Sequence, residues 1–183
     1  MRTPRTATAA SVAFALALSG CAAGAPSTDA PPASSPAVSP TTESSTVAQW
    51  ASLIAQQKAE WDDWAESWDD SECSPAFATT QAGIICRVQL TSATFMATTT
   101  TIEHQLAVTP GKKGFIASSP PAEVSSLFAQ TKTAAETVQR EAEAWDAGGC
   151  STTTGEGCAS LTFAFDRAIG DLSKAFVGWS PYM

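Results

Sequence analysis

Hydrophobic residues recur at alternating steps of three and four along four stretches of the chain. The first stripe comprises Val47, Trp50, Ile54, Gln57, Trp61, Trp64 and Trp68. The third comprises Val124, Phe128, Thr131, Ala135, Val138, Ala142 and Trp145, and the fourth Leu161, Phe165, Ala168, Leu172, Phe176 and Trp179. This spacing is typical of amphipathic helices that pack in a bundle. The pattern predicts an all-α fold.

The second stripe, between the first and the third, is the weakest of the four. Its members are Ile85, Val88, Ser92, Phe95, Thr99, Ile102 and Leu106. The spacing is unchanged, but two members are polar, and the run from Thr98 to Thr101 has poor helix propensity. We expect a helix here with this stripe in the core, ending at Thr109-Pro110-Gly111.

The helical part of the chain contains an internal repeat, of about 47–108 and 124–179. The motif Glu66-x-Trp68-Asp69-x-x-x-Cys73 recurs as Glu143-x-Trp145-Asp146-x-x-x-Cys150, which is 150 − 73 = 77 residues further on. A second cysteine follows in each half where the next helix should begin. Two such units predict an antiparallel up-down-up-down four-helix bundle built from two αα-hairpins, over residues 47–183.

The residues before the bundle have a different composition. Between residues 22 and 46 the chain consists almost entirely of Ala, Pro, Ser, Thr and Gly, with Asp29 and Glu43 as the only charges. Too few large apolar side chains are present to offset the entropy of ordering. We therefore expect residues 21–46 to be a disordered tether.

The first 20 residues are typical of an export signal. Arg2 and Arg5 precede an apolar stretch from Ala7 to Leu18, followed by small residues. The sequence Leu18-Ser19-Gly20-Cys21 resembles the lipobox of bacterial lipoproteins. The resemblance covers residues 1–21 only, and it implies that Cys21 is lipidated. The chain would then be exported and anchored to the outer face of the cell membrane by that lipid. The chain contains no run of 18 or more apolar residues, so we expect no membrane-spanning helix.

Four cysteines remain after Cys21: Cys73, Cys86, Cys150 and Cys158. An even number in an exported chain indicates disulfides, and three pairings are possible. We favour Cys73–Cys86 and Cys150–Cys158, because each would link the end of one helix to the start of its neighbour. The spacings do not fit a compact zinc site, and we expect neither a metal nor a cofactor.

Charge narrows the range of partners. The 183 residues include 18 acids and 10 Lys or Arg, giving a formal net charge of −8. Such a chain offers no basic footprint for nucleic acid. Acids concentrate near the ends of the first and third predicted helices, at Asp62, Asp63, Glu66, Asp69, Asp70, Glu143 and Asp146. In the predicted bundle these ends lie together, away from the tether.

The acidic residues have two interpretations. They form either a solvated outer face or a binding surface for an unidentified envelope or extracellular protein. Carboxylates near a helix C-terminus oppose the helix dipole, so we expect such a cluster to have a compensating use, for example binding. The tryptophans also have two interpretations. They either fill the core or line a pocket for a small ligand, and the candidates for that pocket are Trp61, Trp64, Trp68 and Trp145.

No motif for catalysis is present in the sequence. His104 is the only histidine, and neither a nucleophile elbow nor a phosphate-binding loop occurs. We therefore expect a lipid-anchored extracytoplasmic binding or interaction protein rather than an enzyme. A small-ligand binder or sensor with a Trp-lined interior is the alternative, and a cell-envelope hydrolase is a third, less favoured one.

Overall fold

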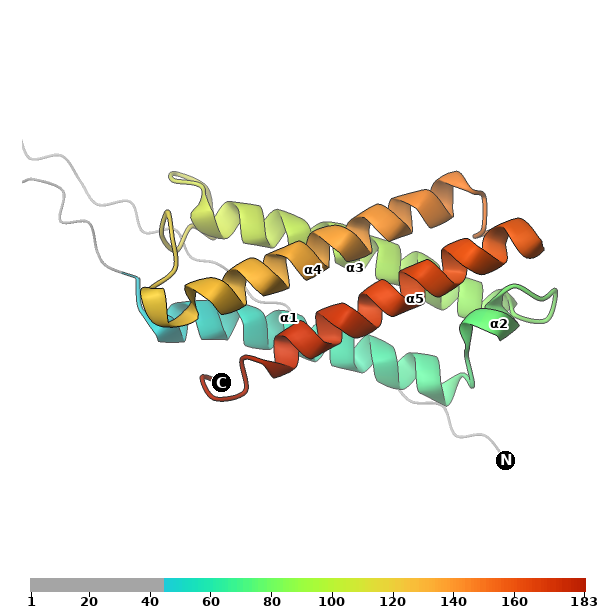
Figure 1. Cartoon of the computed structure of the whole chain (residues 1–183), viewed down its shortest axis with the longest axis horizontal. Coiled ribbons are helices and arrows are strands. Elements are labelled where there is room, and N and C mark those ends of the chain that lie inside the picture. Colours follow the sequence, from blue (N-terminus) through green and yellow to red (C-terminus); the bar gives the residue numbers. More distant parts are fainter. Residues whose placement is uncertain (1–44) are drawn as a thin grey trace, which may run out of the picture. The chain divides into compact units, whose positions relative to one another are not determined.

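The computed structural model describes residues 45–183 (Figure 1). The helices are α1 (Val47–Asp70), α2 (Pro75–Ala78), α3 (Ile84–Val108), α4 (Ala122–Ala147) and α5 (Glu156–Val177). Residues 45–183 contain no β-strand, so the predicted all-α class is confirmed. The predicted signal, Cys21 and all but the last two residues of the predicted tether lie outside the described residues.

The bundle begins at a capping box. The Thr46 hydroxyl accepts a hydrogen bond from the Gln49 amide (3.3 Å), and the Gln49 side-chain oxygen accepts one from the Thr46 amide (2.8 Å). Each bond satisfies a backbone donor that the first turn of a helix would otherwise leave free. This cap fixes the boundary between the low-complexity stretch and the folded residues.

The four long helices pack in a ring. α1 packs against α3 and α5, and α4 also packs against α3 and α5, so α1 and α4 lie diagonally across the bundle (Figure 1). Side-chain partners run in opposite order along each hairpin. In the first, Trp61 contacts Thr100 and Ser67 contacts Gln89; in the second, Thr131 contacts Trp179 and Trp145 contacts Thr162. Each hairpin is therefore antiparallel.

Three of the four predicted stripes form the core. The buried residues of α4 are the seven members of the third stripe, and those of α1 include every member of the first stripe except Val47, which is partly buried. In the fourth stripe Leu161 is partly buried and the other five members are buried, with Trp179 just beyond the end of α5. The six tryptophans are all buried.

The predicted core stripe of the second helix is wrong. Ile85, Val88, Phe95 and Ile102 are exposed, and the buried residues of α3 are Cys86, Arg87, Leu90, Ala93, Ala97, Thr100, Thr101, His104 and Ala107. The buried set has the same spacing of three and four but smaller side chains. Its alanines and threonines face an interior that already holds large indole rings, and close packing leaves no room there for a second set of bulky side chains.

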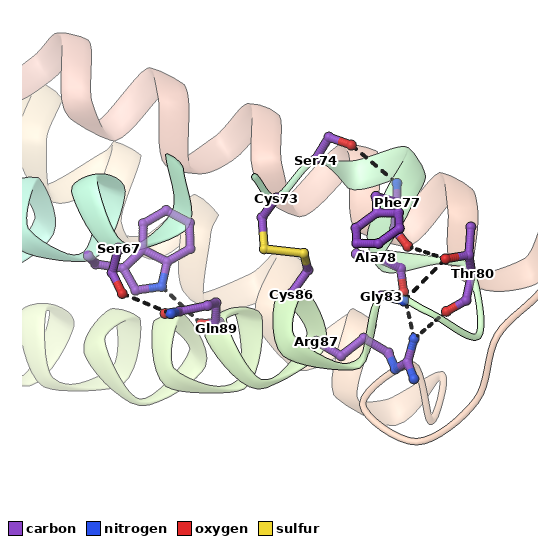
Figure 2. Close-up of a disulfide and its surroundings, with 11 residues drawn as sticks. Ser67, Cys73, Ser74, Phe77, Ala78, Thr80, Gly83, Cys86, Arg87 and Gln89 are labelled. Carbon is purple, nitrogen blue, oxygen red and sulfur yellow. Dashed lines mark hydrogen bonds between the residues drawn. A yellow bond between two sulfur atoms is a disulfide. The ribbon is translucent and has the colours of Figure 1, made fainter. Parts of the chain in front are cut away.

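One short helix was not predicted. α2 occupies the loop between α1 and α3, where the Ser74 hydroxyl accepts from the Phe77 amide at 3.2 Å and Pro75 takes the first helical position. The buried Arg87 side chain holds this loop: its Nη1 donates to the carbonyls of Ala78 (2.9 Å) and Thr80 (2.7 Å) (Figure 2). α2 packs against both α3 and α5, so the first loop also contacts the second hairpin.

Candidate functional site

Two disulfides close the loops at the hairpin ends. Cys73 is bonded to Cys86 (Figure 2) and Cys150 to Cys158, with Cα–Cα distances of 5.4 Å in both. These are the pairings favoured from the sequence. Disulfides persist in oxidising compartments, which indicates an extracytoplasmic environment. No helix within residues 45–183 is long and apolar enough to cross a membrane.

All seven acidic residues singled out from the sequence are exposed. Five belong to the last nine residues of α1, namely Asp62, Asp63, Glu66, Asp69 and Asp70, and these are called the α1 acidic patch below. They lie on the helix opposite the buried tryptophans, because Trp61, Trp64 and Trp68 take the inward positions. Glu143 and Asp146 lie in the last turns of α4.

The structure brings the two acidic groups to one end of the bundle without merging them. The C-terminal ends of α1 and α4 lie at the same end (Figure 1). However, these two helices are diagonal neighbours, so their outer faces point to different sides. Glu143 and Asp146 are therefore a separate, smaller acidic group, and the α1 acidic patch is the denser of the two.

Few basic groups lie near the α1 acidic patch. Lys58 pairs with Asp62 one turn away along α1. The last turn of α1 contains no basic residue, nor does the last turn of α4. Arg87, in the first turn of α3, is buried and bonded to loop carbonyls. Most carboxylates of the patch therefore face solvent, where a basic partner could reach them.

Three of the four candidate pocket tryptophans form one cluster. The Trp64 ring lies 6.0 Å from that of Trp61 and stacks on Trp68 at 5.4 Å. Two indole N–H groups have partners on α3: Trp61 donates to the Thr100 hydroxyl (3.1 Å) and Trp64 to the Gln89 carbonyl (2.9 Å). The three rings thus pack on one another, and the polar edges of Trp61 and Trp64 are occupied by the protein's own core.

Trp145 belongs to the other hairpin. Its ring packs against Phe165 at 6.1 Å, and its indole N–H donates to the Thr162 hydroxyl at 3.1 Å. Trp61, Trp64, Trp68 and Trp145 therefore serve packing in two different places. A shallow surface hollow does exist, but it lies elsewhere on α4, lined by Ala129, Gln130, Thr133 and Ala134.

A buried polar group is the feature that sequence reasoning missed. His104 is fully buried, and its Nε2 lies 2.8 Å from the side-chain oxygen of Gln57, whose amide donates to Glu103 at 2.9 Å. Gln57 is the one polar member of the first stripe, and this was the available signal. A polar residue in a core stripe requires a buried partner, and His104 supplies it.

The surroundings of His104 keep it neutral. The pKa of His104 is lowered from its ordinary 6.5 to about 4, mainly by burial and also by the nearby Lys132 ammonium, while the Glu136 carboxylate partly opposes these effects. The ring also packs edge-on against Phe128 at 5.3 Å. Within residues 45–183 no group of three His, Cys, Asp or Glu side chains is placed to bind a metal.

A comparison with protein-family models, curated proteins and solved structures finds no match to this chain. The features described above define a disulfide-bonded all-α bundle with an acidic end.

Proposed function

We propose that this protein is a lipid-anchored extracytoplasmic binding protein that holds a basic partner on the α1 acidic patch. The lipobox-like sequence ending at Cys21 supports the anchor. The two disulfides support an extracytoplasmic location. The absence of a catalytic motif from the sequence favours binding over catalysis.

The observation that carries this proposal is the density of exposed carboxylates on α1. Asp62, Asp63, Glu66, Asp69 and Asp70 are all exposed within nine residues, with the Lys58 side chain as one local counter-charge. They also approach the C-terminus of α1, where the helix dipole is itself negative. The potential of the dipole therefore adds to that of the side chains at this end.

Such a surface binds mainly through long-range charge attraction. This attraction would speed the encounter with a basic protein or peptide. Salt would weaken the attraction, because the Debye length falls to about 8 Å at physiological ionic strength. A ligand held among the tryptophans would respond little to salt. Salt dependence therefore separates a charged binding surface from an interior pocket.

Binding of a basic probe tests the surface directly. We expect lysozyme, a small basic protein, to bind the full chain at low salt, and the double reversal Asp62→Lys/Glu66→Lys to weaken that binding about tenfold or more. The matched control is Glu123→Lys/Asp171→Lys, which changes the net charge equally but at exposed positions outside the patch. Equal loss in both variants would show that net charge alone is responsible.

The natural partner is sought in the envelope itself. Crosslinking of the anchored protein in intact cells should capture a protein that is retained in the control variant and lost with Asp62→Lys/Glu66→Lys. A partner that both variants capture equally would contradict a role for the α1 acidic patch.

The anchor has its own test. Cys21→Ala removes the thiol that would carry the lipid, so the protein should move from the membrane fraction to the soluble extracytoplasmic fraction. Persistent tight membrane attachment of this variant would show that the lipid is not the sole anchor.

A further inference from the structure

The outer face of α3 carries an apolar stripe that the bundle does not cover. The exposed fractions are 70% for Phe95, 65% for Ile84, 58% for Val88, and 48% for both Ile85 and Ile102. The residues of the predicted second stripe from Ile85 to Ile102, together with Ile84, are called the α3 outer stripe below. It extends along most of the helix.

This face cannot turn inward, because several contacts fix the orientation of α3. Cys86 is bonded to Cys73, the Thr100 hydroxyl accepts from Trp61, and His104 contacts Gln57. These contacts are distributed from the first turn of α3 to its last third. The inward face is thus determined independently of the outer stripe, which contributes little to the core.

The stripe is large for a surface without a partner. Its five apolar side chains leave on the order of 500 Å² of apolar surface exposed, which is near the upper end of the largest patch on a typical monomer. The exposed polar members Ser92 and Thr99 enlarge the area further. A specific interface buries at least about 1,000 Å² in total, and two such faces together provide about that area.

The stripe has the spacing of a coiled-coil seam that fits itself. In an antiparallel pairing about a twofold axis between residues 93 and 94, Ile85 lies opposite Ile102 of the second copy. Val88 then lies opposite its Thr99, and Phe95 opposite its Ser92. In the central layer the large Phe95 meets the small Ser92, and in the next layer Val88 meets Thr99, a side chain of nearly the same shape. Steps of three and four are those with which knobs fit into holes between two helices.

Charge restricts where two copies can meet and disfavours a lipid surface as the occupant of the stripe. Residues 47–183 contain 16 acids and 8 bases, so two copies repel one another over most of their surfaces. Arg87 is the only charged residue between Ile84 and Ile102, and it is buried. The same lack of exposed basic residues offers nothing to anionic lipid, which interfacial helices usually attract with Lys and Arg.

We propose that two copies of this protein associate through the α3 outer stripe in an antiparallel, twofold-symmetric dimer. A twofold dimer uses the same surface on both copies, which is what the self-complementary order of side chains provides. The proposal does not depend on the α1 acidic patch or on a basic partner.

Mass measurement in solution tests this dimer. The full chain with Cys21→Ala, which removes the proposed lipid, should sediment as a dimer at micromolar concentration. Phe95→Glu should yield monomers and raise the dissociation constant by roughly 100-fold or more, because each dimer would then bury two unpaired charges. Phe163→Glu is the matched control: Phe163 is 51% exposed on α5, so the dimer should persist. A monomeric parent chain would overturn the proposal, as would a dimer that Phe95→Glu leaves intact.

Two further measurements check the fold and the register. Because Phe95 is exposed, the far-ultraviolet circular dichroism of Phe95→Glu should match that of the parent. In a mixture of Val88→Cys and Thr99→Cys chains, oxidation should favour the mixed crosslinked pair. Predominant self-crosslinking of Val88→Cys would indicate a parallel arrangement and contradict the proposed one.

Flotation with lipid vesicles tests the other occupant of the stripe. If the parent floats with anionic or zwitterionic vesicles and Phe95→Glu does not, the occupant is a lipid surface and the dimer is overturned.

Discussion

Threonine hydroxyls provide hydrogen-bond acceptors for buried tryptophans at three places in this core. Trp61 donates to Thr100, Trp145 to Thr162, and Trp179 to Thr131, at 2.9–3.1 Å. A buried indole N–H without an acceptor is costly, so these threonines are required where Val would pack equally well. Of these three threonines only Thr131 belongs to a predicted stripe, and its polar character is explained by the Trp179 N–H that it accepts.

Removal of one such hydroxyl should destabilise the bundle. Thr162→Val keeps the shape of the side chain but leaves the Trp145 N–H unsatisfied, and should lower the free energy of unfolding by about 1–3 kcal/mol in urea titrations. In the control Thr137→Val, the lost hydroxyl makes only exposed bonds within its own helix, to the Thr133 carbonyl and from Arg140, and the change should stay within about 0.5 kcal/mol. Equal effects would show that the indole bond contributes nothing.

His104 should make stability depend on pH. The unfolded chain binds a proton at this side chain below about pH 6.5, whereas the native state does so only below about pH 4. The free energy of unfolding should therefore fall as the pH is lowered through this range, by about 3 kcal/mol in total and about 2 kcal/mol between pH 7 and pH 5.

Urea titrations at pH 7 and pH 5 measure this loss. His104→Gln retains a polar side chain but cannot be protonated in this range, so its stability should change much less between the two pH values. The carboxylates contribute equally to both proteins. Parallel losses in the parent and the variant would assign the pH dependence to those carboxylates rather than to His104.

At the scale of single elements, α3 shows how a periodic pattern can mislead. Two stripes with the same spacing of three and four share this helix, and the one with the larger apolar side chains lies outside. The choice depends on what lies opposite: Trp61 and Trp64 of α1 fill the interior, and Ala93 and Ala97 leave room for them. Helix propensity and hydrophobicity contain no information about that neighbour.

The turn into α3 depends on a glycine. A Cβ at Gly83 would lie 2.0 Å from the backbone oxygen of Phe77, so Gly83→Ala should displace α2 and destabilise the protein by more than about 1 kcal/mol. Gly170, inside α5, has no atom within 4 Å of the same position, and Gly170→Ala should stabilise by up to about 1 kcal/mol. Urea titrations compare the two, and effects of the same sign would contradict this assignment.

At the scale of the whole molecule, the acidic end should lower stability. Carboxylates in the last turn of α1 oppose the helix dipole, so Asp69→Asn/Asp70→Asn should raise the free energy of unfolding by about 0.3–1 kcal/mol per charge while weakening the binding of the lysozyme probe. Glu123, in the first turn of α4, has the favourable placement, and Glu123→Gln should lower stability. A variant that gains stability and keeps full binding would remove these two residues from the proposed surface.

The sequence by itself determined the all-α class, three core stripes, the favoured disulfide pairing and the exposure of the acidic residues. Each of these follows from spacing along one helix or across one short loop. Only the tertiary structure decided which face of α3 is buried, which partner His104 has, and that α1 and α4 are diagonal, so that their acidic groups remain separate. These features depend on the volume and polarity of side chains distant in sequence, which only the packed bundle brings into contact.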